Sequence, residues 1–471
     1  MKLREKPTVW KVVEAVAAAH MAVRKNRGRH ARSTIARARY IGVDFGTSGA
    51  RAAVIDDATN ITAEASTSYE PSSSLDEAWR SALWRLLESL PAEQRAQAAS
   101  IAVDGTSATT LLIDGDTGEV LAPPRMYNEA QPEQAVARAK ALAPPDHTAT
   151  ASTSTLCKVL AWDGEGAWQA AAAAGHSPAF AHQADWVAGL LHGQWRVTDY
   201  NNALKLGFDP AEECYPEWLA EQPLASLLPL AVVAPGAPVA PVTPEAAARA
   251  GLPQGCLVCG GTTDSIAAFV AAGVTEPGEA VTSLGSTLAI KLLSTTRVDD
   301  ARYGLYSHRL GDAWLVGGAS NTGGAVLRRF FSDAQLAELT QRMDASSPTG
   351  LDYYPLTAPG ERFPVNDPAL QPRLEPRPAD DAVFLQGILE SIARIEAQAY
   401  RLLAEQGATP VTRVLTAGGG AKNPVWTQLR QRELGVPVLA STQAEAAYGS
   451  ALLAKRGAAL AAPSPTALVV Y

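Results

Sequence analysis

One stretch near the start of the chain restricts what the rest can fold into. Residues 40–56 read Tyr-Ile-Gly-Val-Asp-Phe-Gly-Thr-Ser-Gly-Ala-Arg-Ala-Ala-Val-Ile-Asp, so two apolar runs flank a polar turn rich in glycine. Alternating apolar residues on both sides of a glycine turn predict a β-hairpin with residues 46–49 at its tip. Glycines there can take positive φ and let backbone N–H groups approach a phosphate. The stretch therefore predicts a strand, a phosphate loop and a second strand.

The polar side chains of this turn fit the same interpretation. Thr47 and Ser48 supply hydroxyl donors for phosphate oxygens, and Asp44 supplies oxygen ligands for a hydrated Mg²⁺ or for a sugar hydroxyl. Short motifs of this kind also occur in ordinary hairpins. A matching second half of the chain is needed to decide between the two interpretations.

The length of the chain predicts more than one domain. Its 471 residues exceed what one hydrophobic core usually supports, and 47% apolar with 19% charged residues is a normal globular balance. No apolar run approaches the ~20 residues that cross a bilayer. We therefore expect two large domains in a soluble protein without a membrane partner.

Positive charge is concentrated at the N-terminus. Residues 1–39 hold eleven Lys and Arg against two acidic residues, so the remaining chain carries 29 basic and 46 acidic residues, a net charge of −17. Such a body should repel nucleic acid. The arm is poor in acids and fits an amphipathic helix over residues 9–23, which is the pattern of an organelle transit peptide. We expect import into the chloroplast, with the mitochondrion or the cytoplasm as alternatives; a structural or regulatory extension also remains open.

The four cysteines do not predict a disulfide scaffold or a zinc site. Cys256 and Cys259 have the spacing of a redox or metal pair, but no second pair completes a zinc site. They lie in an apolar, strand-like run, so we expect them in the core.

A second polar loop follows a predicted strand in residues 101–114. Asp104, Thr106 and Ser107 occupy the break between two apolar runs. Open α/β sheets bind ligands at strand ends. We expect this loop to face a ligand.

The pattern of the opening stretch returns in residues 257–269. A strand ends in Gly260-Gly261 and a helix begins near Ser265, which places Asp264 in the first helical turn. The helix dipole and free N–H groups stabilise a carboxylate there as the anion. Asp264 is therefore a candidate general base, although an N-cap role explains the same residue type.

Two further glycine-rich segments follow. Residues 283–287, Ser-Leu-Gly-Ser-Thr, echo the first hairpin tip, so two such tips would grip a polyphosphate from both sides. Residues 321–324, Asn-Thr-Gly-Gly, open a helix. Residues 417–423 contain three glycines before a helix with Pro424 at its first position, and bare backbone permits a flat ligand such as adenine.

Five segments taken together resemble the FGGY carbohydrate kinases of the actin-like ATPase superfamily. The resemblance runs from Tyr40 to about Ala454 and rests on five segments in the family's order, which are Asp44-Phe-Gly-Thr-Ser48, Gly260-Gly-Thr-Thr-Asp264, Ser283-Leu-Gly-Ser-Thr287, Gly360-Glu-Arg-Phe-Pro364 and Ala417-Gly-Gly-Gly-Ala-Lys-Asn423.

The resemblance implies an α/β fold of two ribonuclease H-like domains with the active site in the cleft between them. It implies an N-terminal domain at residues 40–273 that binds the sugar and carries the base, and a C-terminal domain at residues 274–471 that binds ATP, after a basic arm at residues 1–39. It also implies ATP and Mg²⁺ as cofactors.

The same resemblance assigns roles to individual residues. Asp264 is implied as the catalytic base and a sugar contact, Asp44 as a contact to substrate or Mg²⁺, and Thr106 and Ser107 as sugar contacts. The residues implied to bind ATP are Gly46, Thr47, Ser48, Gly285, Ser286, Thr287, Gly324, Gly418, Gly419, Gly420 and Asn423.

The polar loop at residues 104–107 indicates which sugar the protein phosphorylates. Many xylulokinases have Gln-Met-His where this chain has Asp104-Gly-Thr-Ser107, and a Thr-Ser pair is similar to plant and cyanobacterial D-ribulose kinases. We therefore expect D-ribulose as acceptor and D-ribulose 5-phosphate as product. Xylulokinase, glycerol kinase and an actin-like ATPase switch are the alternatives, and the oligomeric state, monomer or homodimer, stays open.

Overall fold

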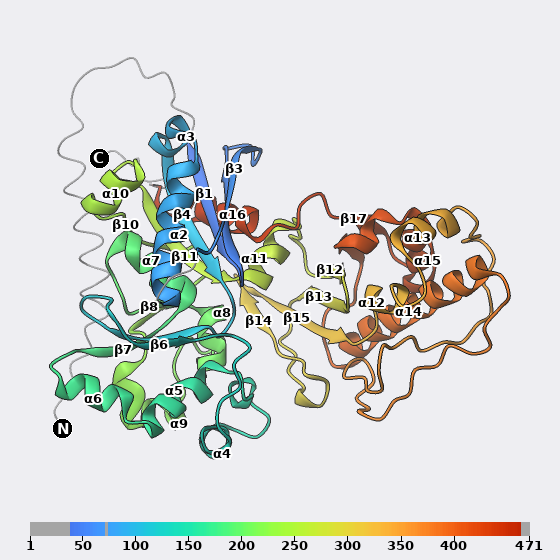
Figure 1. Ribbon diagram of the computed structural model, residues 1–471, viewed down its shortest axis with the longest axis horizontal. Coiled ribbons are helices and arrows are strands. Elements are labelled where there is room, and N and C mark those ends of the chain that lie inside the picture. The colour runs from blue at the N-terminus through green and yellow to red at the C-terminus, as the bar shows by residue number, and fades with distance from the viewer. Residues whose placement is uncertain (1–37, 71–73, 463–471) are drawn as a thin grey trace, which may run out of the picture.

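The structure is a computed structural model that describes residues 38–70 and 74–462 (Figure 1). The basic arm up to residue 37, with the expected helix over residues 9–23, lies outside these residues. Two six-stranded sheets dominate the fold and lie side by side along the long axis of the molecule. Within the described residues, no helix is long and apolar enough to cross a membrane.

The first sheet is mixed, and its strands come mainly from the first half of the chain. In spatial order they are β10 (Pro238–Pro241), β11 (Leu257–Thr263), β4 (Ala98–Gly105), β1 (Arg39–Phe45), β2 (Gly49–Ile55) and β3 (Ile61–Ser68).

The predicted hairpin of the opening stretch is confirmed. β1 and β2 pair antiparallel up to Phe45 opposite Ala50, and the Gly46 N–H donates to the Gly49 carbonyl at 3.0 Å. The expectation of positive φ was wrong, because neither glycine adopts it. Gly49 is required for another reason: a Cβ there would lie 2.4 Å from the carbonyl oxygen of Thr67 on β3.

β1, β4 and β11 run parallel, so their carboxyl ends meet at one edge of the sheet. β4 lies between the other two, with Asp104 opposite Asp44 on β1 and opposite Thr262 on β11. The strand order therefore brings together two acidic positions that lie 60 residues apart in the sequence.

The second sheet repeats this topology. Its strands in spatial order are β14 (His308–Leu310), β15 (Ala313–Ser320), β13 (Leu288–Ser294), β12 (Glu279–Leu284), β16 (Arg413–Ala417) and β17 (Val438–Ala440). The order β15-β13-β12-β16-β17 matches β3-β2-β1-β4-β11, with an antiparallel hairpin beside parallel strands in both sheets. Two ribonuclease H-like cores are thus present, as the sequence predicted.

Helices cover both faces of the first sheet. Three pack on one face through apolar side chains, which are α2 (Leu75–Ser89), α7 (Gln183–His192) and α10 (Pro244–Ala250). The opposite face is covered by α16 (Ala446–Ala461), the last described helix. The sequence predicts that residues 274–471 form the second domain. α16 lies within that range but packs on the first sheet. The boundary at residue 273 remains a prediction.

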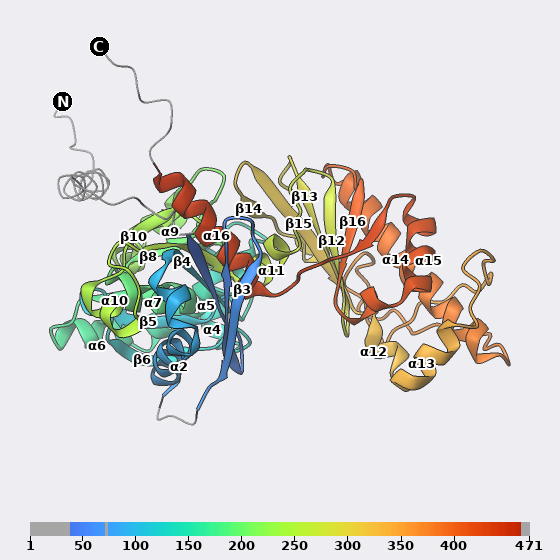
Figure 2. The ribbon, with the colours of Figure 1, turned by 90° about the horizontal axis from the view of Figure 1, so that it is seen from above.

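One helix is shared between the two sheets. α11 (Asp264–Ala271) packs against α16, and its Ile266 and Phe269 contact Val281 and Leu293 of the second sheet. Figure 2 shows α11 between the two sheets. The candidate base, the first residue of α11, therefore lies at the junction of the two halves.

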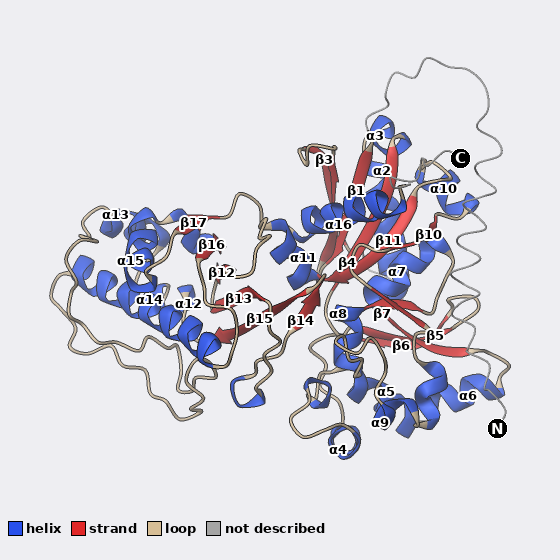
Figure 3. Cartoon of the chain, turned by 180° about the vertical axis from the view of Figure 1, so that it is seen from behind, coloured by secondary structure: helices blue, strands red, loops and turns tan. Residues whose placement is uncertain are grey.

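The remaining elements flank these cores (Figure 3). Two small sheets order as β6 (Val120–Arg125), β5 (Thr110–Asp114) and β7 (Pro178–His182), and as β8 (Val197–Asp199) with β9 (Ala231–Val233). The other helices of the first half are α3 (Ala92–Ala96), α4 (Glu133–Leu142), α5 (Thr155–Gly164), α6 (Ala167–Ala173), α8 (Tyr200–Ala203) and α9 (Glu217–Ala220). Those of the second half are α12 (Gly324–Leu327), α13 (Asp333–Thr340), α14 (Asp381–Glu405) and α15 (Pro424–Leu434). Short 3₁₀ turns occupy Thr148–Thr150, Leu204–Leu206, Pro223–Leu227, Ala301–Tyr303 and Gly419–Lys422.

Candidate active site

Three carboxyl groups gather at the edge where the parallel strands of the first sheet end. Asp44 lies near the carboxyl end of β1, and Asp104 lies opposite it on β4. Asp264 is the first residue of α11, directly after β11. Asp104 is 0% exposed and Asp44 is 5% exposed, whereas Asp264 is half-buried. Asp264 is therefore the member of the group that a ligand can reach most easily.

Asp44 and Asp104 form a buried acid pair. The Oδ1 atoms of both lack a hydrogen-bond partner in the described chain, and Ser450 of α16 donates to Asp104 Oδ2 at 2.5 Å. Burial and the nearby Asp44 carboxylate raise the pKa of Asp104 well above its ordinary value. Burial also raises the pKa of Asp44, while Asp104 and Arg51 act in the opposite direction. Asp104 therefore holds a proton more readily than Asp44 does, and Asp44 is the more readily ionised member of the pair.

Asp264 has the environment of a general base. The N-cap of α11 is Thr263 rather than Asp264, and Asp264 Oδ1 accepts the Ser265 N–H at 2.5 Å. Burial is the main cause that raises the pKa of Asp264, and Asp44 adds to it; the Ser265 N–H, Lys291 and Lys205 lower it. A carboxylate with a raised pKa is a stronger proton acceptor than an ordinary aspartate.

A lysine of the second sheet stands beside this base. The Lys291 ammonium on β13 donates to the Ser265 carbonyl, and burial lowers the pKa of Lys291 to about 8 although Asp264 favours its charged form. Thr287 lies at the tip of the β12–β13 hairpin, four residues before Lys291. In an extended strand this separation corresponds to roughly 13 Å. One strand therefore connects the base to that tip.

The loop at residues 106–109 contains both predicted sugar contacts, but they differ in availability. The Thr106 hydroxyl is buried and lies 2.6 Å from Thr109 Oγ1 and 2.9 Å from Gln183 Oε1. Ser107 is half-buried, and its hydroxyl has no hydrogen-bond partner among the described residues. Ser107 is thus the hydroxyl that this loop offers to a ligand, and Thr106 fixes the loop internally.

A large cavity lies in the second half of the chain. Its volume is about 840 Å³, and six predicted ATP-binding residues line it, which are Gly285, Ser286, Gly324, Gly419, Gly420 and Asn423. Five others do not line it, which are Gly46, Thr47, Ser48, Thr287 and Gly418. Thr47 and Ser48 are exposed at the tip of the first hairpin, and the corresponding tip of the second hairpin carries Thr287.

Apolar and charged side chains both line the cavity. Leu336, Ala337, Leu385 and Leu389 supply apolar surface of the kind that buries a planar base. Arg328 and Lys422 supply positive charge, and Arg328 Nη2 donates to Ser286 Oγ at 2.9 Å.

Sequence reasoning missed these lining residues, because the apolar ones follow the ordinary periodicity of core helices. Arg328 carried a weak signal, since it lies one helical turn after Gly324.

Two glycines shape the cavity by allowing close backbone contacts. Gly323 has a φ of +146°, and a Cβ there would lie 2.7 Å from the Cα of Thr287. Gly418 has a φ of +85°, and a Cβ there would lie 2.8 Å from the carbonyl of Leu284. Larger residues at either position would push the β12–β13 hairpin away from the cavity.

Asn423 and Glu361 support the walls of the cavity. Asn423 accepts the Trp426 N–H at 2.9 Å as the N-cap of α15, and its amide donates to Thr340 Oγ1 at 3.0 Å. Glu361, from the Gly360–Pro364 segment, is buried and accepts from the Ser320 hydroxyl at 2.5 Å and from the Asn321 N–H at 2.8 Å. Glu361 thereby fastens the segment that leads to Gly324.

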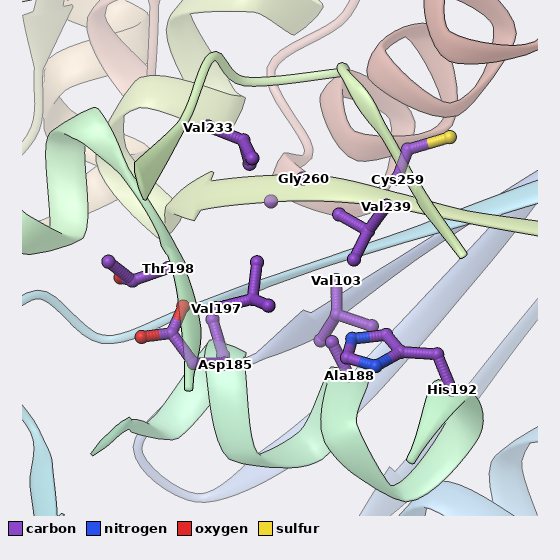
Figure 4. Close-up of a pocket in the computed structure, with 12 residues that line it drawn as sticks. Val103, Asp185, Ala188, His192, Val197, Thr198, Val233, Val239, Cys259 and Gly260 are labelled. Atoms are coloured by element: carbon purple, nitrogen blue, oxygen red, sulfur yellow. The ribbon is translucent and has the colours of Figure 1, made fainter. Parts of the chain in front are cut away.

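A second, much smaller hollow lies between β11 and α7 (Figure 4). Its volume is about 20 Å³, which holds one water molecule. Asp185 and His192 of α7 line it, and burial lowers the pKa of His192 to about 4, so the imidazole is neutral. Cys259 also lines this hollow. Cys256 and Cys259 are both buried, as predicted for core residues.

The carboxylates of the site differ in how well they suit Mg²⁺. In residues 38–70 and 74–462, no group of three or more His, Cys, Asp or Glu side chains could hold a metal ion by itself. Mg²⁺ in phosphoryl transfer usually takes one or two carboxylates and completes its shell with water and substrate phosphates. Asp44 fits that requirement, because its buried Oδ1 has no hydrogen-bond partner among the described residues other than the neighbouring Asp104 carboxyl.

Comparison with known proteins agrees with this architecture. Residues 280–458 match the C-terminal domain of the FGGY family of carbohydrate kinases. The xylulose kinase of Bacillus subtilis (strain 168) is 26% identical over 224 residues, 45% of this chain and 44% of that protein. The chain thus aligns with less than half the length of this curated relative.

Solved structures are similar over nearly the whole chain. The xylulose kinase from Rhodospirillum rubrum has a TM-score of 0.74 at 25% identity, covering 91% of this chain and 90% of that chain. The Plasmodium falciparum glycerol kinase with ADP has a TM-score of 0.74 at 15% identity, covering 91% of both chains, and shows a likeness of fold. Residues 280–458 therefore resemble the C-terminal domain of the FGGY carbohydrate kinases, and the whole chain has the two-domain, actin-like fold of the similar kinase structures.

Proposed function

We propose that this protein is an ATP-dependent kinase that phosphorylates a ketopentose, D-ribulose to D-ribulose 5-phosphate. The observation that carries the proposal is the position of Asp264. Asp264 begins α11, the helix that packs against both sheets, and it lies beside the buried acid pair. Lys291, from the β12–β13 hairpin whose tip lines the large cavity, donates to the carbonyl of the next residue, Ser265. A base on one domain and a nucleotide-sized cavity on the other are the two parts that phosphoryl transfer to a hydroxyl requires.

The chemistry assigned to these residues is proton removal and charge neutralisation. Asp264 takes the proton of the acceptor hydroxyl as that oxygen forms a bond to the γ-phosphorus of ATP and the bond to the ADP oxygen breaks. Arg328 and Ser286, which line the cavity, would bind phosphate oxygens of ATP. Asp44 would hold Mg²⁺ through its carboxylate, and the ion would neutralise phosphate charge.

The preference for D-ribulose rests on the loop at residues 106–109. Ser107 is a small hydroxyl residue that is accessible and unpartnered, and it leaves room for the acceptor. The similarity to xylulose kinases supports a pentulose acceptor and favours D-xylulose as the second candidate.

The test is coupled ADP release by the purified full chain with Mg-ATP, comparing D-ribulose, D-xylulose, L-ribulose and glycerol at equal concentration. We expect the highest kcat/KM with D-ribulose. A higher value with D-xylulose would keep the kinase and refute the choice of sugar. ADP release that ignores every sugar would refute the kinase and favour an ATPase switch.

We also propose that residues 1–39 direct import into the chloroplast, because their composition is that of a transit peptide. A fluorescent fusion of these residues tests this, and retention in the cytoplasm of plant cells would refute it.

A further inference from the structure

A lysine is buried inside the first domain without an acidic partner. Lys158 on α5 is 0% exposed, and its ammonium donates to the carbonyls of Ala108 at 2.7 Å and Thr153 at 2.8 Å. No carboxylate of the described residues lies within ion-pair distance of it. Burial lowers the pKa of Lys158 to about 8, although Glu129 favours the charged form. Burying an ammonium costs free energy that its hydrogen bonds must offset.

The residue that Lys158 holds has an unfavourable backbone conformation. Ala108 has a φ of +68°, in the left-handed region that a residue with a Cβ rarely adopts. The Thr110 hydroxyl donates to the same carbonyl at 3.0 Å, so two donors fix the peptide group of Ala108. Conformations of this kind persist where surrounding contacts enforce them, and they cluster at ligand sites.

Ala108 directly follows Ser107, the available hydroxyl of the loop. The preceding Thr106 is fixed by Gln183, whose Oε1 accepts both the Thr106 N–H at 3.0 Å and its hydroxyl at 2.9 Å. The following Thr109 Oγ1 accepts the Tyr127 N–H at 3.0 Å. Among the side chains of residues 106–109, the Ser107 hydroxyl is therefore the polar group that has no partner in the described residues and can bind a ligand.

We propose that Lys158 is a positioning residue for the acceptor sugar. Its ammonium holds Ala108 in the left-handed conformation and thereby sets the place of the Ser107 hydroxyl at the sugar site. This inference rests on the proposed function, because it assigns Lys158 a part in binding the same acceptor. Lys158 itself touches neither sugar nor ATP.

The test is steady-state kinetics of Lys158→Met with D-ribulose and ATP varied separately. We expect the sugar KM to rise about tenfold, the ratio that corresponds to losing a local conformational constraint of this size, while the ATP KM stays within about twofold. Ala108→Gly in the Lys158→Met background should restore most of the sugar KM, because glycine adopts positive φ without a held carbonyl. A purely structural lysine would not show this rescue.

The matched control is Arg138→Met. Arg138 ties α4 to α5 through the Leu160 carbonyl at 3.3 Å and Asp163 at 2.6 Å, in the same part of the fold but away from the loop. It should lower thermal stability and leave both KM values unchanged.

Several outcomes would overturn the proposal. An unchanged sugar KM in Lys158→Met would do so, and so would an equal rise in the two KM values or the absence of rescue by Ala108→Gly. If Lys158→Met does not fold, Thr110→Val removes the second donor to the Ala108 carbonyl and should raise the sugar KM about threefold, a part of the constraint; no rise would refute the inference. A wild-type chain that ignores all sugars would refute the proposed function and this positioning role together.

Discussion

Replacing Asp264 by Asn removes the proposed base while keeping the shape and hydrogen bond at the start of α11. The amide oxygen can still accept the Ser265 N–H that Asp264 Oδ1 accepts at 2.5 Å. Neither neighbour can take over as base, because Asp104 is 0% exposed and bonded to Ser450, and Asp44 is 5% exposed. The full contribution of a general base should therefore be lost, about 10²–10⁴ in kcat, or about 3–5 kcal/mol.

The assay is coupled ADP release with sugar and ATP each varied. We expect kcat to fall by that factor and the ATP KM to stay within about twofold, since the cavity lies on the other sheet. Asp380→Asn is the matched control, because the exposed Asp380 accepts the Ala382 N–H at 2.8 Å at the start of α14, in the other half of the chain from the acid pair. A variant Asp264→Asn with near-normal kcat would refute the assignment of the base.

Asp264→Asn should lower kcat but should not lower the stability of the fold. The pKa of Asp264 is raised in the folded protein, so the fold disfavours its ionised form. The folded state therefore loses stability as pH rises from below the unfolded pKa through the folded pKa. Asn carries no such cost, so Asp264→Asn should unfold at an equal or higher urea concentration at neutral pH. A clear loss of stability would show that the carboxylate is held mainly for structure.

Three further substitutions test other parts of the fold and site. Gly449→Ala should lower the free energy of unfolding by about 1–3 kcal/mol or more in urea titrations, because its Cβ would lie 1.8 Å from the carbonyl of Ala267 between α16 and α11. Lys291→Met removes a cation that lowers the pKa of Asp264, so the acid limb of the kcat–pH profile should move to higher pH. Arg328→Ala should raise the ATP KM about tenfold through a lost charged hydrogen bond, with the sugar KM unchanged.

Each of these has a matched comparison. Gly164→Ala should be nearly neutral, since its Cβ would meet no atom within 4 Å. Lys455→Met, which alters a half-buried lysine on α16 whose ammonium donates to the Asp57 carbonyl, should leave the acid limb in place. Arg329→Ala removes the neighbouring guanidinium, which bonds the Thr357 carbonyl at 2.7 Å and does not line the cavity, so the ATP KM should not change. Equal behaviour of a variant and its comparison would refute the corresponding reasoning.

Much of the fold was predictable because it depends on local patterns. The hairpin at residues 40–55, the strand before Asp104 and the long helix α14 follow from apolar periodicity and glycine placement, which act over a few residues. Helix ends were less accurate. The apolar spacing of residues 157–174 predicts one helix, but the structure divides it into α5 and α6 at Gly166, whose φ is +70°. The sequence likewise predicts that the helix opened by residues 321–324 runs through Phe331, but α12 ends at Leu327.

The candidate site was predictable where it follows a strand end and unpredictable where it depends on packing. Asp44, Asp104 and Asp264 each stood at a recognisable strand or helix boundary in the sequence. The roles of Lys158 and Ser450 had no local signal, because each contacts a partner 50 or 346 residues away. Such contacts appear only when the sheets are assembled.

The placement of α16 constrains how the protein is made. This helix lies on β1 so closely that a Cβ on Gly42 would be 2.0 Å from the Ala447 carbonyl, and it reaches the acid pair through Ser450. The first sheet therefore exposes one apolar face until residues 446–461 have left the ribosome. The first half of the chain, although synthesised first, should complete its folding last, and ribosome-bound chains should become resistant to protease in that half only after α16 emerges.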